Sequence, residues 1–143
     1  MKAMPILKNY DPQAMRLGMI QTFCEVVMQG VKDLAFSPIM EPEEWEDLKE
    51  DANKLAHHFK VQAYVERDLI SSDLVPDSAI RDKVIVLYYK EPAILDAYLA
   101  LKASVRELEA QGAFDDQARE SHSIRLRKLL SYSETAIRDH YKK

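Results

Sequence analysis

The fold is decided by residues 59–70, FKVQAYVERDLI, where the repeat of the apolar residues changes. Before Phe59 they recur at every third or fourth position, which is typical of an amphipathic helix. Beyond Phe59 they take every second position: Val61, Ala63 and Val65. On a helix these three side chains would point in different directions, whereas on a strand they share one face. The stretch therefore predicts a strand over about residues 61–70.

A second strand is predicted at residues 83–89, within the run KVIVLYYK. Six consecutive β-branched, leucyl and aromatic residues closed by Pro92 favour a buried strand over a helix. The two strands are joined by a polar segment and are expected to form a small hairpin. Two strands alone are marginal, so we expect them to pack on helices or to extend a sheet across a dimer.

Apolar repeats and capping residues predict about four helices in a single domain of residues 1–143. They run from Pro12 to about Phe36, from Pro42 to Phe59, from Pro92 to the glycine at 112, and from Asp116 to His140. The predicted fold is thus α+β and predominantly helical. The alternative is an all-α helical bundle, in which both strand segments are helical.

Composition narrows the class of protein. A net charge of -4 argues against nucleic acid as the main partner, because that affinity depends on neutralising phosphates. The single cysteine, Cys24, cannot form an internal disulfide and indicates a reducing, cytoplasmic compartment. No apolar run approaches the ~20 residues of a membrane span, so no membrane partner is expected.

The first predicted helix has an unusually broad apolar surface. Apolar side chains cover about 200° of its circumference at ~100° per residue, and Met19 and Val26 lie beside the main stripe. One neighbouring layer seldom covers so wide an arc. We therefore expect this helix either to be central or to contribute to a homo-oligomer. The expected dimer forms through this helix or through the edge of the sheet.

A candidate site follows from the first predicted strand. Tyr64, Glu66 and Asp68 project from one strand face, with about 6.6 Å between alternate Cα atoms. Two carboxylates and a phenol suit general acid/base work or the binding of a hard cation. Tyr88 and Lys90 on the second strand are candidates to face them. The alternative is a solvated strand face with a cross-strand ion pair.

Tyrosines suggest a pocket for a small flat or apolar ligand. The residues assigned to ligand binding are Tyr64, Tyr88, Lys90 and Tyr98, whereas Glu66 and Asp68 are the catalytic candidates. With three glycines in the chain there is no glycine-rich phosphate loop, so no cofactor is assigned. No metal ligand is assigned either.

Two functions are consistent with these features. The first is a cytoplasmic self-associating adaptor or small-ligand-binding protein, suggested by the broad apolar helix and the missing catalytic motifs. The second is a small enzyme that uses Glu66 and Asp68 for acid/base or metal-assisted chemistry. Oligomeric state and the surroundings of Glu66 separate the two.

Overall fold

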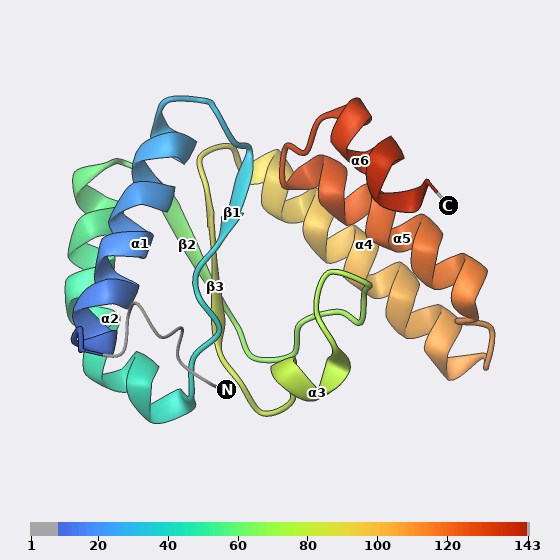
Figure 1. The fold of residues 1–143 in the computed structure, drawn as a ribbon, viewed down its shortest axis with the longest axis horizontal. Coiled ribbons are helices and arrows are strands. Elements are labelled where there is room, and N and C mark those ends of the chain that lie inside the picture. Colours follow the sequence, from blue (N-terminus) through green and yellow to red (C-terminus); the bar gives the residue numbers. More distant parts are fainter. Residues whose placement is uncertain (1–8, 143) are drawn as a thin grey trace.

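A three-stranded antiparallel sheet, in the order β1–β3–β2, lies between two layers of helices (Figure 1). The computed structural model describes residues 9–142. The strands are β1 (Leu34–Phe36), β2 (Gln62–Glu66) and β3 (Ile85–Tyr89). The helices are α1 (Pro12–Met28), α2 (Pro42–His58), α3 (Asp77–Ile80), α4 (Pro92–Ala110), α5 (Asp116–Leu129) and α6 (Glu134–Tyr141). Helices α1 and α2 cover one face of the sheet, whereas α4, α5 and α6 lie on the other side (Figure 1).

Strand β3 is the central strand of the sheet, and all five of its residues are buried. It pairs with β1 through Ala35 opposite Tyr88, and with β2 through Tyr64 opposite Leu87. Successive side chains on a strand point to opposite faces. Val86 and Tyr88 therefore enter one core, and Ile85, Leu87 and Tyr89 enter the other, which explains why β3 is a continuous apolar run.

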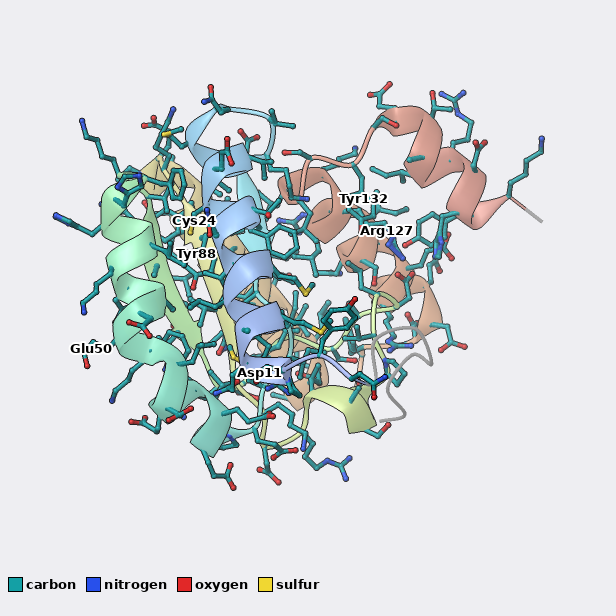
Figure 2. All side chains as sticks on the ribbon, turned by 60° about the vertical axis from the view of Figure 1, so that its left-hand side comes forward. Asp11, Cys24, Glu50, Tyr88, Arg127 and Tyr132 are labelled. Carbon is teal, nitrogen blue, oxygen red and sulfur yellow. The ribbon has the colours of Figure 1, made fainter. Side chains whose placement is uncertain are left out.

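Each face of the sheet has its own hydrophobic core. The first core joins α1 and α2 to the sheet through Ile20, Cys24, Val27, Trp45, Leu48, Ala52, Val86 and Tyr88. The second joins α4 and α5 to the sheet through Leu34, Ile85, Leu87, Tyr98, Leu101, Val105 and Leu126. Figure 2 shows Cys24 and Tyr88 in the region between α1 and the strands. Burial raises the pKa of the Cys24 thiol to about 12, so this residue is a core residue and no ready nucleophile.

The predicted α+β, predominantly helical fold is confirmed, and the all-α alternative is wrong. The change of repeat after Phe59 does mark a new element, because Lys60 adopts a left-handed φ of 58° between α2 and β2. The predicted pairing of the two strands is also present, over Gln62–Glu66 and Ile85–Tyr89. Both strands are shorter than the predicted ranges of 61–70 and 83–89.

The structure differs from the prediction in four places. Helix α1 ends at Met28, because Gly30 takes a left-handed φ of 78° there. The chain beyond it forms β1, so the sheet has three strands instead of two. The last predicted helix is two helices, α5 and α6, separated where Ser131 has a φ of 67° and Ser133 caps α6. The short helix α3 lies in the segment predicted to be a polar connection.

None of the helices of residues 9–142 combines the length and the apolar character that crossing a bilayer requires.

Candidate functional site

The carboxylate of Glu66 is buried at the end of β2 and is bonded on both oxygens. Its side chain is 3% exposed. Oε2 accepts a hydrogen bond from the Tyr98 hydroxyl at 2.8 Å, and Lys102 Nζ donates to both oxygens at 2.9 and 3.0 Å. The backbone N–H of Asp68 donates to Oε1 at 2.9 Å. Four hydrogen bonds match the roughly four lone-pair sites of a carboxylate, so none is left for a substrate.

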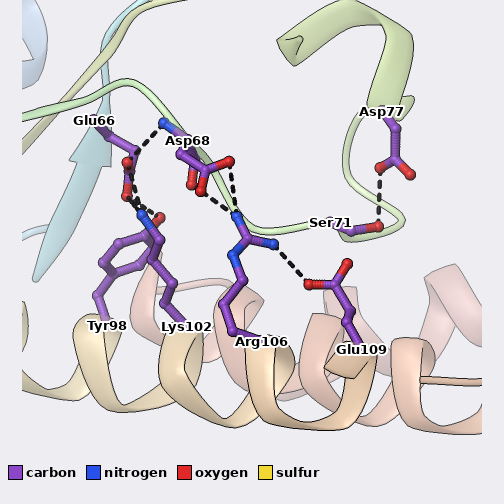
Figure 3. A network of polar contacts seen from close by, with 8 residues as sticks. All are labelled: Glu66, Asp68, Ser71, Asp77, Tyr98, Lys102, Arg106 and Glu109. Atoms are coloured by element: carbon purple, nitrogen blue, oxygen red, sulfur yellow. Dashed lines mark hydrogen bonds and ion pairs between the residues drawn. The ribbon is translucent and has the colours of Figure 1, made fainter. Parts of the chain in front are cut away.

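The partners of Glu66 come from one face of α4. Tyr98, Lys102 and Arg106 are four residues apart, a spacing that aligns side chains on a helix. Figure 3 shows this row reaching toward the chain that follows β2. Burial, and then the adjacent Glu66 carboxylate, raise the pKa of the Tyr98 hydroxyl, so it remains a hydrogen-bond donor. The contacts of these three residues attach the end of β2 and the chain that follows it to α4.

Asp68 lies outside this buried pair. Its side chain is 75% exposed, and Oδ1 forms an ion pair with Arg106 at 3.0 Å. Arg106 also contacts Glu109 at 2.7 Å (Figure 3). The structure thus brings Glu66 and Tyr98 into contact, whereas Asp68 is held separately by a different helix residue.

The other predicted ligand residues are dispersed. Tyr64 is half-buried against the α4 side of the sheet. Tyr88 is buried in the core on the opposite face, beside Cys24, where burial raises the pKa of its hydroxyl. Lys90 lies at the far end of β3 from Glu66 and donates to the Met28 carbonyl at 3.2 Å. Tyr88 and Lys90 therefore do not face the Glu66 carboxylate.

Sequence reasoning missed a second polar cluster, which anchors the connection of residues 67–76. Asp73 accepts from Arg127 at 2.8 Å and from the Tyr141 hydroxyl at 2.6 Å. Its backbone N–H donates to Ser123 Oγ at 3.0 Å. These partners belong to α5 and α6, which are far from Asp73 in sequence. The row on α4 was detectable from its four-residue spacing, whereas no local pattern identifies the partners of Asp73.

One hollow combines an apolar floor with charged groups. It has a volume of about 280 Å³ and is lined by Asp33, Ala97, Leu101, Arg125, Lys128 and Leu129. This volume is just below that of most small-molecule sites, which range over roughly 300–1,000 Å³. None of the predicted ligand residues lines it. Its walls come from the chain before β1, from α4 and from α5, so no single stretch of sequence indicates it.

The outer edge of β2 has backbone groups that pair with no strand among residues 9–142. Ser37 N–H donates to the Val86 carbonyl at 2.8 Å, and Val84 and Met40 exchange hydrogen bonds, so Val84 and Val86 point toward the β1 side. Backbone groups alternate in direction along a strand, so those of Ile85, Leu87 and Tyr89 point toward β2. Their partners Gln62, Tyr64 and Glu66 point back to β3. The N–H and C=O groups of Ala63 and Val65 therefore point away from the sheet.

The comparisons with known proteins provide no relative. No family model matches the chain, and neither a curated protein nor a solved structure is similar to it at a meaningful level. Within residues 9–142 there is also no group of three or more His, Cys, Asp or Glu side chains arranged to hold a metal ion.

We predict that Glu66→Gln destabilises the fold by about 2 kcal/mol. The amide leaves the ammonium of Lys102 partly buried without its counter-charge, and breaking a buried pair is costly. Urea denaturation of the variant and the wild type measures the difference. Asp68→Asn is the matched control, because its exposed pair with Arg106 is expected to contribute less than about 1 kcal/mol. Equal stability of Glu66→Gln and wild type would contradict the structural role of Glu66 and favour an acid/base role.

We predict that Tyr88→Phe stabilises the protein by about 1 kcal/mol. The Tyr88 hydroxyl is buried and has no hydrogen-bond partner among the described residues. Leaving a buried polar group unsatisfied costs about 1–3 kcal/mol, and phenylalanine keeps the ring while removing that group. Thermal and chemical unfolding provide the measurement, with Tyr98→Phe, which loses a bonded hydroxyl, as the destabilised counterpart. A loss of stability in Tyr88→Phe would show that its hydroxyl has a partner.

Proposed function

We propose that this protein is a non-catalytic interaction module that self-associates through the free edge of β2. The observation that carries the proposal is the pair of outward-pointing backbone groups on Ala63 and Val65. An exposed strand edge of this kind is a template for another strand. Pairing through it would satisfy these groups and extend the three-stranded sheet across two chains.

The side chains of β2 strengthen the proposal. Proteins usually protect free edges with charged side chains, proline or bulges. The only charge within β2 is Glu66, which is turned inward and neutralised by Lys102. Val65 is 38% exposed, and Ala63 beside it is also exposed. The edge thus offers apolar side chains and no charge that would repel another strand.

The other sheet edge is less suited to this role. Strand β1 has three residues, and Leu34 and Ala35 are fully buried. Its chain continues into Ser37 and Pro38, and a proline has no N–H to donate to a new strand. Assembly through the sheet is therefore more favourable at β2.

Helix α1 is the weaker alternative for self-association. Much of its broad apolar surface packs on the first core, with Ile20, Cys24 and Val27 buried and Leu17, Phe23 and Met28 partly buried. Met19 remains 44% exposed. A single exposed methionine is ordinary on a protein surface and does not by itself indicate an interface.

The enzyme hypothesis based on Glu66 and Asp68 receives less support. A general acid or base has to reach the proton that it transfers. Glu66 has its lone pairs engaged, and the void beside it, lined by Ile39, Leu69, Ile80 and Val84 among others, has no room for a water molecule. We therefore favour a structural role for this carboxylate.

The proposal predicts that Val65→Lys weakens self-association at least tenfold. A lysine at this position brings two like charges close together on one face of the extended sheet when two copies pair, and edge lysines are a natural means of preventing strand addition. Sedimentation equilibrium over a range of protein concentrations measures the effect. The matched control is Val65→Thr, which keeps a β-branched, uncharged residue and is expected to associate like the wild type.

Both Val65 variants change an exposed residue, so at concentrations where the protein is monomeric their unfolding free energies should stay within about 0.5 kcal/mol of the wild type. A wild-type protein that stays monomeric at millimolar concentration would overturn the proposed function. Association that Val65→Lys leaves unchanged would place the interface elsewhere.

A further inference from the structure

We infer that two copies pair their β2 strands in antiparallel orientation about a two-fold axis centred on Tyr64. This inference rests on the proposed self-association and adds the partner residue that each position of β2 faces. It follows from which backbone groups of β2 are free, from where its apolar side chains lie and from the charges at its two ends.

The free backbone groups restrict the pairing. In an antiparallel pair, hydrogen-bonded positions are formed by residues whose N–H and C=O groups point toward the other strand. On β2 these residues are Ala63 and Val65, because Gln62, Tyr64 and Glu66 are directed to β3. The N–H of Val61 is already used, since it donates to the Ala56 carbonyl at 3.0 Å. A register that relies on Ala63 and Val65 therefore gains the most bonds.

A centre at Tyr64 uses both residues on both strands. Ala63 of each copy then lies opposite Val65 of the other, and each such pair exchanges two N–H···O bonds. A centre at Ala63 would instead place Val65 opposite Val61, whose N–H is engaged. A centre at Val65 would place Ala63 opposite Arg67, a long charged residue that pairs with Glu46 at 3.6 Å.

The apolar side chains also favour the centre at Tyr64. Ala63 and Val65 lie on the same face of β2, the face of the first core, and both are exposed. In this register the four side chains from two copies form one cluster across the axis. On the other face the two Tyr64 rings, which are half-buried in the single chain, come together at the axis. Aromatic cross-strand pairs are among the favourable ones.

Charges at the two ends of β2 complement each other in the same register. Lys60 and Asp68 flank β2 just beyond its two ends, so in this register Lys60 of one copy comes near Asp68 of the other at both ends of the pairing. Lys60 is exposed, and Asp68 has a side chain that is 75% exposed even while it contacts Arg106. With the centre at Ala63, Lys60 would approach Glu66, which is buried and already neutralised.

Disulfide trapping tests the register. The native cysteine, Cys24, is fully buried, so it does not interfere with cysteines introduced on β2. A non-hydrogen-bonded antiparallel pair has Cα atoms about 4.5 Å apart, within the range that a disulfide accepts. Three single variants are compared under mild oxidation: Ala63→Cys, Tyr64→Cys and Val65→Cys. Only a residue on the two-fold axis faces its own copy, so we expect Tyr64→Cys to form covalent dimers at least tenfold faster than the other two.

Two further variants serve as controls for the trapping. Tyr64→Ser shows whether association survives the loss of the ring. Gln29→Cys places an exposed thiol at the end of α1, where it reports random collisions. Tyr64→Cys dimers that form no faster than Gln29→Cys dimers would overturn the inference.

The outcomes separate the register from the proposed function. Fast trapping at residue 63 or 65 overturns the centre at Tyr64 and leaves assembly through β2 in place. Self-association without trapping at any of the three positions overturns both the register and the use of β2. A protein that remains monomeric overturns the proposed function itself.

Reversing the end charges gives a second, independent readout. Lys60→Glu places two acids side by side at each end and is expected to weaken association about fivefold. Combining it with Asp68→Lys restores the opposite charges and should recover most of the loss. Lys142→Glu, an equivalent change at the end of α6, is the control and should have no effect. Failure of the double variant to recover any affinity would contradict the pairing of Lys60 with Asp68.

Discussion

The burial of β3 on both faces and its pairing on both sides constrain the rest of the structure. A strand with every side chain buried requires a layer of helices on each face. Here α1 and α2 provide one layer and α4 and α5 the other, so Tyr88 and Leu87 enter separate cores. The pairing of β3 is completed by one strand on each side. The strand on the far side, β2, then has an edge that nothing in the described chain pairs with.

The second layer of helices is attached to this sheet by polar contacts as well as by apolar packing. Glu66, at the end of β2, is joined to Tyr98 and Lys102 of α4, and Asp73 is joined to Arg127 of α5. Each of these acids is paired with a cation and bonded to a tyrosine. Such contacts position the connection of residues 67–76 across the helices. They also direct the charge of Glu66 away from the outer edge of β2, which leaves this edge uncharged.

Sequence patterns revealed the elements with a clear repeat. The alternation from Val61 to Val65 and the apolar run before Lys90 identified β2 and β3, and the stripe of Ile20, Cys24 and Val27 identified the buried face of α1. The sequence patterns gave wrong helix ends where a left-handed backbone conformation ends the helix. Gly30 ends α1 earlier than the apolar repeat does, and a left-handed Ser131 divides the last helix. Strand β1 was missed because three apolar residues fit a helical stripe equally well.

The candidate site was only partly predictable, because several of its contacts depend on the tertiary fold. Glu66 and Tyr98 do meet, because strand and helix periodicity place them on facing surfaces. Lys102 could have been predicted from the same helical spacing but was not chosen as a site residue. Tyr88 was placed with them because it lies on the neighbouring predicted strand, yet one step along β3 turns a side chain to the opposite core. The partners of Asp73 come from residues 123–141, and only the tertiary fold brings such distant segments together.

Amide hydrogen exchange along β2 measures both its pairing with β3 and the freedom of its outer edge, so it tests directly whether β2 is the strand through which two copies associate. At low protein concentration we predict slow exchange at Tyr64 and Glu66 and fast exchange at Ala63 and Val65. Raising the concentration should slow exchange at Ala63 and Val65 while leaving Tyr64 unchanged. Slow exchange at Ala63 and Val65 in the monomer would show that the edge of β2 is not free, and fast exchange at both in the associated protein would show that β2 does not form the interface.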